Sequence, residues 1–223
     1  MIKAVIFDFD GTIANTIPAI REGVNATMRR YGYPEHSDAA ILSFINFGAR
    51  QLIRNAMPAE LRGDEALVDR VLADYNEDYS RVYDHTRVAY GGIPELLDRL
   101  HRAGHPVGIL SNKQDVFVKK LSEQVLLRGS WDSAHGVGPG QPAKPDPFLS
   151  ELVARELGVK TSECIMVGDS DVDIRTAENA GMLHVGVSWG YRDEDFLRAH
   201  GAVRIARTVD ELEAILHSCL TEA

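Results

Sequence analysis

The sequence has few of the features that mark secreted, membrane-bound or nucleic-acid-binding proteins. It contains only 2 cysteines, Cys164 and Cys219, which have neither the count of a disulfide framework nor the spacing of metal ligands. No apolar run approaches the length that crosses a bilayer, and no secretory leader precedes the first predicted strand. We therefore expect a cytoplasmic protein with reduced thiols and no membrane partner.

Blocks of basic residues and clusters of histidines are also missing. The formal net charge is -9, and no run rich in lysine or arginine offsets it locally, so nucleic acid is not an expected partner. The histidines lack the spacing of zinc ligands. With 223 residues, of which 44% are hydrophobic and 26% charged, the chain has the composition of a globular protein. It has room for one large domain or two smaller ones.

What the sequence does contain is a regular alternation of strand and helix patterns. Helical patterns follow one another from residue 92 onward, and the last of them covers residues 209–216. Between them, and before them, lie predicted strands at residues 4–7, 106–110, 133–137, 164–168, 184–187 and 203–206, of which 4–7 and 164–168 are the clearest apolar runs. Repeated strand–helix–strand units predict an α/β fold, a Rossmann-like parallel sheet with right-handed crossovers that is flanked by helices.

The region between the first two strands has a different pattern. Apolar residues recur at helical spacing in residues 17–28 and again in residues 64–82, without a convincing strand. We predict an inserted α-helical cap domain of residues 15–88 and a core domain of residues 1–14 and 89–223. An inserted module on two short linkers can open and close over a site. The alternative is a helical hairpin that packs rigidly on the sheet.

Polar side chains follow several of the predicted strands. Asp8 and Asp10 come directly after the first strand, on the same side of an extended chain, and Gly11 allows a sharp turn there. Two carboxylates so close together repel each other unless a cation lies between them. Ligands of parallel sheets bind beyond the carboxyl ends of the strands. The other polar groups predicted at that edge are Ser111, Asn112, Lys144, Asp169 and Asp173.

The charges of this group do not balance. Four of its members are carboxylates, and one lysine, Lys144, opposes them. At ~4 Å and an effective dielectric constant of ~20, each pair of like charges costs ~4 kcal/mol. A hard divalent cation would compensate for this repulsion, and Mg²⁺ suits a site made only of oxygen ligands. The sequence therefore predicts a magnesium site.

Four motifs, in order along the chain, resemble those of the haloacid dehalogenase-like (HAD) phosphohydrolases. They are Asp8-x-Asp10-Gly11-Thr12, Ser111-Asn112, Lys144-Pro145-Asp146-Pro147 and Gly168-Asp169-Ser170-x-x-Asp173. The helical insertion lies where one subgroup of that family carries its cap. Residues 185–192 resemble the phosphoglycolate phosphatase branch, which also includes small pyrophosphatases.

The resemblance implies a catalytic role for each of the first two acids. Asp8 would attack phosphorus and become an aspartyl phosphate, which divides one difficult displacement into two easier steps. Asp10 would donate a proton to the leaving oxygen and then accept one from the hydrolytic water. A dehalogenase of the same fold needs the first acid but not the second. The presence of Asp10 therefore favours a phosphatase.

The resemblance also implies how metal and phosphate are bound. Mg²⁺ would be held by the Asp8 carboxylate, the Asp10 main-chain carbonyl and Asp169. Asp173 would orient either Lys144 or a metal-bound water. The phosphoryl group would be bound by residues of the second and third motifs together with amides at a helix start, namely Ser111, Asn112 and Lys144.

Substrate specificity would lie in the cap, where residues 45–50 resemble the substrate loop of the family. Gly48 and Arg50 are the predicted specificity residues, and Arg50 could pair with a carboxylate or a second phosphate of the substrate. The alternative for Arg50 is a solvated helix residue. Lys113, just after the second motif, is a further candidate for such a contact.

Together these inferences predict a Mg²⁺-dependent phosphatase that hydrolyses a small phosphorylated metabolite. Phosphoglycolate is the best single substrate, and the protein is expected to be a monomer or a homodimer. Two alternatives use the same two acids, a pyrophosphatase and a β-phosphoglucomutase-like phosphotransferase. A third is not an enzyme but a phosphate-sensing interaction module, in which a phosphorylated aspartate changes a surface. The helical insertion and Asp10 disfavour this third alternative.

Overall fold

The computed structural model describes residues 1–45, 47–86 and 88–221. The chain forms two compact units, one of residues Met1–Asn15 and Val88–Ala223 and the other of residues Thr16–Arg87. The first is an α/β unit and the second is helical. The predicted domain limits lie one residue away from these junctions.

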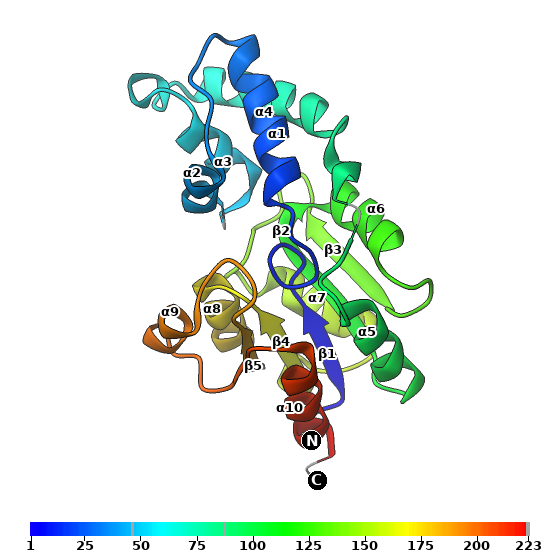
Figure 1. Cartoon of the computed structure of the whole chain (residues 1–223). Coiled ribbons are helices and arrows are strands. Elements are labelled where there is room, and N and C mark those ends of the chain that lie inside the picture. Colours follow the sequence, from blue (N-terminus) through cyan, green and yellow to red (C-terminus); the bar gives the residue numbers. More distant parts are fainter. Residues whose placement is uncertain (46, 87, 222–223) are drawn as a thin grey trace. The chain divides into compact units, whose positions relative to one another are not determined.

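A six-stranded parallel sheet forms the centre of the α/β unit (Figure 1). Its strands lie side by side in the order β3-β2-β1-β4-β5-β6, and all the pairs are parallel. Their bounds are β1 (Ala4–Phe7), β2 (Val107–Gln114), β3 (Ser133–Val137), β4 (Cys164–Gly168), β5 (Leu183–Val187) and β6 (Ile205–Ala206). The predicted α/β class, with a Rossmann-like parallel sheet, is confirmed.

Strand β1 lies at the centre because its residues are apolar on both faces. All of Ala4–Phe7 is buried, and the strand pairs with β2 on one side and with β4 on the other. The chain order reverses between β1 and β4, since β2 and β3 follow outward on one side and β5 and β6 on the other. In parallel α/β sheets such a reversal creates a crevice at the carboxyl ends of the two strands, where ligands bind. The residues that follow β1 and β4 lie at these carboxyl ends, the place that we call the crevice.

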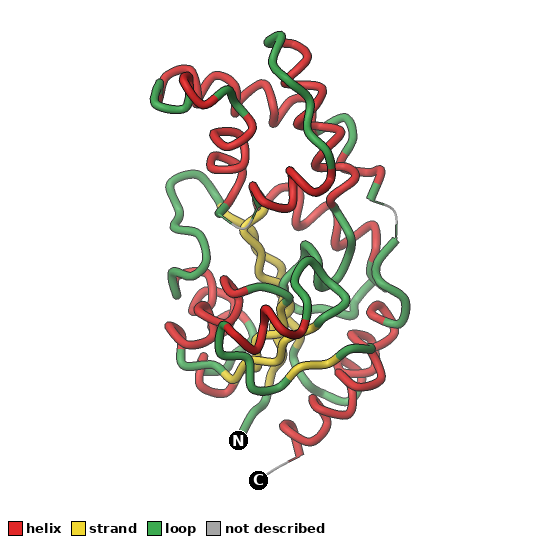
Figure 2. Tube along the Cα trace, turned by 60° about the vertical axis from the view of Figure 1, so that its left-hand side comes forward, coloured by secondary structure: helices red, strands yellow, loops and turns green. Residues whose placement is uncertain are grey.

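Helices cover both faces of the sheet (Figure 2). Helices α7 and α8 contact each other, as do α5 and α10. The bounds of these helices are α5 (Ile93–Arg102), α6 (Asp115–Val125), α7 (Phe148–Glu156), α8 (Asp171–Ala180), α9 (Glu194–Ala199) and α10 (Val209–Thr221), and a 3₁₀ turn at Thr161–Glu163 precedes β4. Within the described ranges, no helix is both long and apolar enough to span a bilayer.

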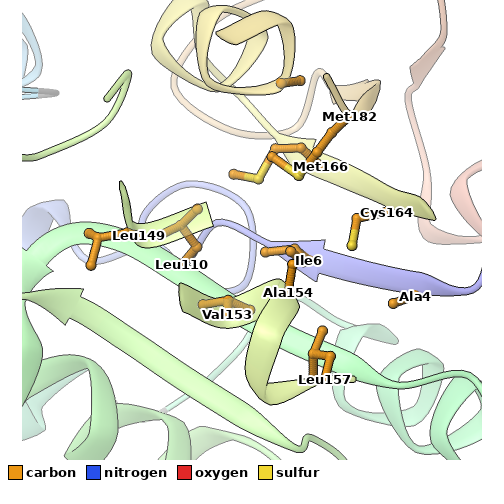
Figure 3. Packing of buried hydrophobic residues seen from close by; sticks show 11 residues of the cluster. Ala4, Ile6, Leu110, Leu149, Val153, Ala154, Leu157, Cys164, Met166 and Met182 are labelled. Carbon is orange, nitrogen blue, oxygen red and sulfur yellow. The ribbon is translucent and has the colours of Figure 1, made fainter. Parts of the chain in front are cut away.

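An apolar cluster joins the sheet to α7 and α8 (Figure 3). Ile6 of β1, Leu110 of β2 and Met166 of β4 pack with Leu149 of α7. The thiol of Cys164 belongs to the same cluster, and burial raises its pKa to about 12. This cysteine is therefore a protonated core residue rather than a reactive thiolate.

The helical unit contains α1 (Ile17–Arg30), α2 (Asp38–Phe44), α3 (Gly48–Ala56) and α4 (Glu65–Tyr79), with 3₁₀ turns at Ala59–Leu61 and Tyr83–His85. Helices α1 and α4 pack against each other. Asp78 of α4 is only 6% exposed; it accepts a hydrogen bond from Thr27 Oγ1 at 3.0 Å and pairs with Arg30 at 2.8 Å. The described residues of this unit contain no strand, as the sequence predicts.

Four elements differ from the prediction, and one of them is the last helix, predicted over residues 209–216, which continues to Thr221. The sequence pattern does not predict helix α9. The signal for this helix is its cap residue Asp193, whose side chain accepts a hydrogen bond from Phe196 N–H at 2.8 Å. The predicted last strand is shorter, since only Ile205–Ala206 pairs with β5 and Val203 is 80% exposed. Strand β2, in contrast, continues through the second motif to Gln114.

Candidate active site

Three carboxylates converge at the carboxyl ends of β1 and β4. Asp8 follows β1, and its main-chain N–H donates to the Val167 carbonyl of β4 at 2.9 Å. Asp169 follows β4, and Asp173 lies in the first turn of α8. Carboxylate oxygens of the three acids lie within 4.8 Å of one another, and all three residues are buried. The fold thus brings together predicted site residues from two distant parts of the sequence.

The ammonium group of Lys144 lies between two of these carboxylates. Its Nζ is 2.8 Å from Asp8 Oδ1 and 2.7 Å from Asp173 Oδ1, and only 3% of the side chain is exposed. Asn112 holds the main chain of the lysine, since Asn112 Nδ2 donates to the Lys144 carbonyl at 3.0 Å and Lys144 N–H donates to Asn112 Oδ1 at 2.7 Å. Asn112 therefore positions the loop that carries Lys144. Its direct contact with phosphate stays a prediction.

Asp173 has a second task at the start of α8. Its Oδ2 accepts hydrogen bonds from Ser170 N–H at 3.1 Å and from Ser170 Oγ at 2.7 Å, which caps the helix. Gly168 leaves room for this arrangement, because a Cβ at that position would collide with the Asp173 side chain. The contact between Asp173 Oδ1 and Lys144 is the geometry that the predicted orienting role requires.

Asp169 is held by residues to which the sequence analysis gives no role, although one of them, Thr12, belongs to the first motif. Thr12 Oγ1 donates to Asp169 Oδ1 at 3.3 Å, and Tyr191 N–H donates to Asp169 Oδ2 at 2.6 Å. The indole Nε1 of Trp189 donates to the Thr12 carbonyl at 3.2 Å, which ties the two segments together. We call Thr12, Trp189, Gly190 and Tyr191 the Asp169 clasp.

Gly190 of the clasp lies where no side chain fits. A Cβ at this position would collide with the Gly11 carbonyl and with the Asp169 side chain. The sequence signal for the clasp is the stretch 185–192, which resembles phosphoglycolate phosphatases, but its contacts with Asp169 could not be read from it. They depend on how closely two distant segments approach.

Asp10 faces a second lysine. Lys113 Nζ lies 3.1 Å from Asp10 Oδ1, and 6% of the lysine side chain is exposed. Ser111 Oγ donates to Asp10 Oδ2 at 3.5 Å. The prediction that Lys144 alone opposes four carboxylates is therefore wrong. It is wrong because β2 continues past Ser111 and carries Lys113 to the same edge of the sheet.

Burial and mutual repulsion make Asp8 and Asp169 hard to ionise. Burial raises the pKa of Asp8 to about 7, with Asp173 and Asp10 adding to the rise and Lys144 opposing it. Burial also raises the pKa of Asp169 well above its ordinary value, and the neighbouring carboxylates add to it. Desolvation lowers the pKa of Lys144, but Asp173 and Asp8 outweigh it, so the pKa of the lysine is raised. With all four acids ionised, the site would carry more negative charge than its two lysines balance, and the raised pKa values reflect burial and this repulsion.

A divalent cation fits this set of residues. Two ammonium groups, those of Lys144 and Lys113, oppose four carboxylates, which leaves the charge that one divalent ion neutralises. The clustered ligand atoms are all carboxylate oxygens, which suits Mg²⁺ better than zinc. The carboxylates of Asp8 and Asp169 are the predicted ligands, and the participation of the Asp10 carbonyl stays a prediction.

The predicted specificity residues lie in the helical unit. Gly48, with a φ of 80°, begins α3, and Arg50 lies in the first turn of that helix. Arg50 pairs with Glu65 at 2.8 Å and with Asp69 at 2.7 Å, and 40% of its side chain is exposed. Asn46 of the predicted substrate loop lies outside the described residues. The contact of Arg50 with a substrate stays a prediction.

Comparison with known proteins relates nearly the whole chain to one group. Residues 5–187 match the family model described as haloacid dehalogenase-like hydrolase. A phosphoglycolate phosphatase of Pseudomonas syringae pv. tomato is 29% identical over 221 residues, which cover 98% of this chain and 80% of that protein. A crystal structure from Lactobacillus delbrueckii subsp. bulgaricus matches with a TM-score of 0.85 at 30% identity, over 99% of both chains. The β-phosphoglucomutase of Clostridium difficile matches with a TM-score of 0.80 at 19% identity, over 98% of this chain and 97% of that one, a likeness that shows the fold alone.

Proposed function

The chain belongs to the haloacid dehalogenase-like hydrolase family, as its four motifs predict, and from this premise we propose that it is a Mg²⁺-dependent phosphatase of small phosphate monoesters. One observation carries the proposal. The buried ammonium of Lys144 bridges Asp8 and Asp173 beside Asp169, at the crevice of the sheet. A carboxylate nucleophile, a fixed cation and a cluster of oxygen ligands are the parts that phosphoryl transfer needs.

The proposed reaction has two displacements at phosphorus. In the first, a carboxylate oxygen of Asp8 attacks, the bond from phosphorus to the ester oxygen breaks, and Asp10 gives its proton to that oxygen. The alcohol leaves, and the phosphoryl group stays on Asp8 as an acyl phosphate. In the second, Asp10 accepts a proton from water, whose oxygen attacks phosphorus. Inorganic phosphate leaves, and Asp8 returns to a free carboxylate.

Positive charge offsets the repulsion between a phosphate dianion and the Asp8 carboxylate. Bound Mg²⁺ would supply part of that charge through its contacts with Asp8 and Asp169. Lys144 supplies another part from a fixed position, because Asn112 holds its main chain and Asp173 holds its ammonium. Ser111, buried at the same edge, would donate a hydrogen bond to the phosphoryl group. The Asp169 clasp keeps the metal ligand in one orientation.

Phosphoglycolate is the substrate that we propose first. A relative named phosphoglycolate phosphatase matches 98% of this chain, and the stretch 185–192, which resembles that branch, contributes the clasp around Asp169. The helical unit would act as a cap that closes over the site and excludes large phosphorylated molecules. Small phosphate esters are therefore the proposed substrate class.

The test is a phosphate-release assay on the purified chain, with phosphoglycolate, 2-hydroxyethyl phosphate, pyrophosphate and β-glucose 1-phosphate. We expect release from phosphoglycolate with Mg²⁺, none with EDTA, and recovery when excess Mg²⁺ is returned. Release that is indifferent to EDTA contradicts the metal assignment, and no release from any ester contradicts the function. Conversion of β-glucose 1-phosphate to glucose 6-phosphate without free phosphate indicates a mutase. A long-lived phosphoaspartate without turnover indicates a sensing module.

A further inference from the structure

Lys113 takes part in no step of the proposed reaction, although the fold places this residue in the site. Its Nζ lies 3.1 Å from Asp10 Oδ1, and 6% of the side chain is exposed. The main chain is held as well, because Lys113 N–H donates to Ser111 Oγ at 3.2 Å and a Cβ at Gly136 would collide with the Lys113 carbonyl. The fold therefore fixes a positive charge next to Asp10 through both the side chain and the main chain.

The two lysines of the site face different ends of the bond that breaks. Lys144 contacts Asp8 and Asp173, so its charge lies beside the nucleophile and the phosphoryl group that it accepts. Lys113 contacts Asp10, which exchanges a proton with the leaving oxygen. An acid must come within about 2.6–3.2 Å of the oxygen that it protonates. The Lys113 ammonium therefore lies on the leaving-group side of the site.

We propose that Lys113 is a specificity-determining residue, which selects leaving groups with a carboxylate close to the ester oxygen. The inference rests on the proposed phosphatase function and narrows its substrate class. In phosphoglycolate, one methylene group separates the ester oxygen from the carboxylate. An ammonium 3.1 Å from Asp10 can reach that carboxylate while Asp10 reaches the ester oxygen. A lysine ammonium carries three N–H donors, so one group can hydrogen-bond both to Asp10 and to the substrate carboxylate.

Lys113 is better placed for this task than Arg50. Arg50 already pairs with Glu65 and Asp69 of α4 and lies in the helical unit. Lys113 and Asp10 belong to the same α/β unit, so the distance between their charged groups is set within one compact body. The Lys113 ammonium, which binds the carboxylate of the leaving group, thus lies next to Asp10, the acid that protonates the leaving oxygen.

The experiment compares two esters that differ at one group. Phosphoglycolate carries a carboxylate where 2-hydroxyethyl phosphate carries a neutral hydroxymethyl group. We measure kcat/KM for both esters, with Mg²⁺, on the wild-type chain and on K113M, K113Q and K113R. The readout is the ratio of the two kcat/KM values. A loss of activity that a Lys113 substitution causes by disturbing Asp10 lowers kcat/KM for both esters alike and cancels in this ratio.

The wild-type chain is expected to prefer phosphoglycolate by at least about 10-fold, the effect of one charge-assisted hydrogen bond. In K113M and K113Q the ratio falls by about 10–100-fold, and K113R keeps most of it because the positive charge remains. K119M is the matched control. Lys119 also pairs with an aspartate, Asp115, at 2.7 Å, but half of its side chain is exposed on α6, so its loss leaves the ratio unchanged.

Two results overturn the inference. One is a wild-type chain that hydrolyses both esters equally well, and the other is a K113M or K113Q chain whose ratio equals that of the wild type. In both cases the phosphatase function stands, since phosphate is released. A wild-type chain that releases phosphate from neither ester overturns the proposed function, and the selection of leaving groups with it.

Discussion

The crevice of the α/β unit and the ion pairs around Arg50 in the helical unit hold their charges in opposite ways. In the α/β unit the ion pairs of the crevice are buried, as the pair of Lys144 and Asp173 shows, with 3% and 0% of the two side chains exposed. In the helical unit Arg50 and its partners Glu65 and Asp69 are exposed by 40% or more. A buried ion loses hydration that its partners must replace, whereas an exposed pair contributes only about 0–1 kcal/mol to stability.

Asp78 shows that a buried acid alone does not mark a functional site. It lies in the helical unit, and two arginines and a threonine compensate its charge: Arg30 at 2.8 Å, Arg81 at 3.4 Å and Thr27 at 3.0 Å. The contacts with Arg30 and Thr27 join α1 to α4. In the crevice of the α/β unit, four carboxylates face two lysines. What distinguishes the crevice is therefore uncompensated negative charge, which a metal ion can neutralise.

The largest expected effect is that of replacing Asp8, the buried acid of the crevice, in contrast to Asp78. D8N is expected to lower kcat/KM by at least about 10³-fold, because it removes the proposed nucleophile. Burial already raises the pKa of Asp8 to about 7, so the loss of its charge should leave the melting temperature unchanged or higher. Phosphate release and thermal unfolding test both statements, and wild-type turnover in D8N would contradict the mechanism.

D78N is the matched variant in the helical unit. It is expected to lower the free energy of unfolding by about 1–3 kcal/mol, because Arg30 and Thr27 lose a charged partner in a buried place. Its kcat should stay within about twofold of the wild type, since Asp78 contributes no group to the chemistry. Urea unfolding and steady-state kinetics test this. A large loss of kcat in folded D78N would break the division of tasks between the units.

A smaller effect is expected from G190A in the Asp169 clasp. The new Cβ collides with the Gly11 carbonyl and the Asp169 side chain, and such overpacking costs about 1–3 kcal/mol. Because the collision displaces a predicted metal ligand, the Mg²⁺ concentration for half-maximal activity should rise by about 10-fold or more. G91A is the control, since a Cβ at Gly91 meets nothing within 4 Å. An unchanged Mg²⁺ requirement in G190A would separate the clasp from the metal site.

R50A tests the exposed charges of the helical unit. Its free energy of unfolding should change by less than about 0.5 kcal/mol, because both ion pairs are exposed. If Arg50 binds a substrate anion, KM rises by about 3–10-fold with little change in kcat, the pattern of lost uniform binding. R54A is the control, since Arg54 pairs with the same Glu65 at 2.8 Å. Equal KM values for R50A and R54A would remove Arg50 from the site.

The smallest expected effect concerns pH and stability. Burial raises the pKa of Asp8 from 3.8 to about 7. Between these values the folded chain keeps a proton that the unfolded chain has lost, so this group lowers the free energy of unfolding as the pH rises through the interval. Mg²⁺ binds ionised carboxylates, so it should raise the melting temperature more at about pH 7.5 than at about pH 5. Each kcal/mol corresponds to about 2–4 °C in a chain of this size.

The variant D169N supplies the control for this measurement. It removes a predicted metal ligand, so the Mg²⁺-induced rise in melting temperature should differ less between the two pH values than it does in the wild-type chain. A Mg²⁺-induced shift that is equal at both pH values in the wild-type chain would mean that the ion does not bind to Asp8. Scanning fluorimetry with and without EDTA is sufficient for both chains.

Much of the fold was predictable because its signals are local. The strand 4–7 is apolar and is followed by Asp8, and the strand 164–168 is followed by Asp169, so both acids had to lie at the carboxyl ends of parallel strands. Helix α9 was harder to predict, since it is short and its cap, Asp193, is also typical of a turn. Nothing local marks Lys113 as a partner of Asp10, because the contact depends on how far β2 continues.

The order of residues was enough to determine which groups are present at the crevice: acids after two buried strands, a lysine in a loop and the parallel arrangement that gathers them. Tertiary structure decided which charge meets which. Lys144 could have faced any of the acids, and it faces Asp8 and Asp173 because Asn112 holds its loop. Coulomb and hydrogen-bond energies depend on distances of a few ångström between segments far apart in the chain, and only the folded packing determines those distances.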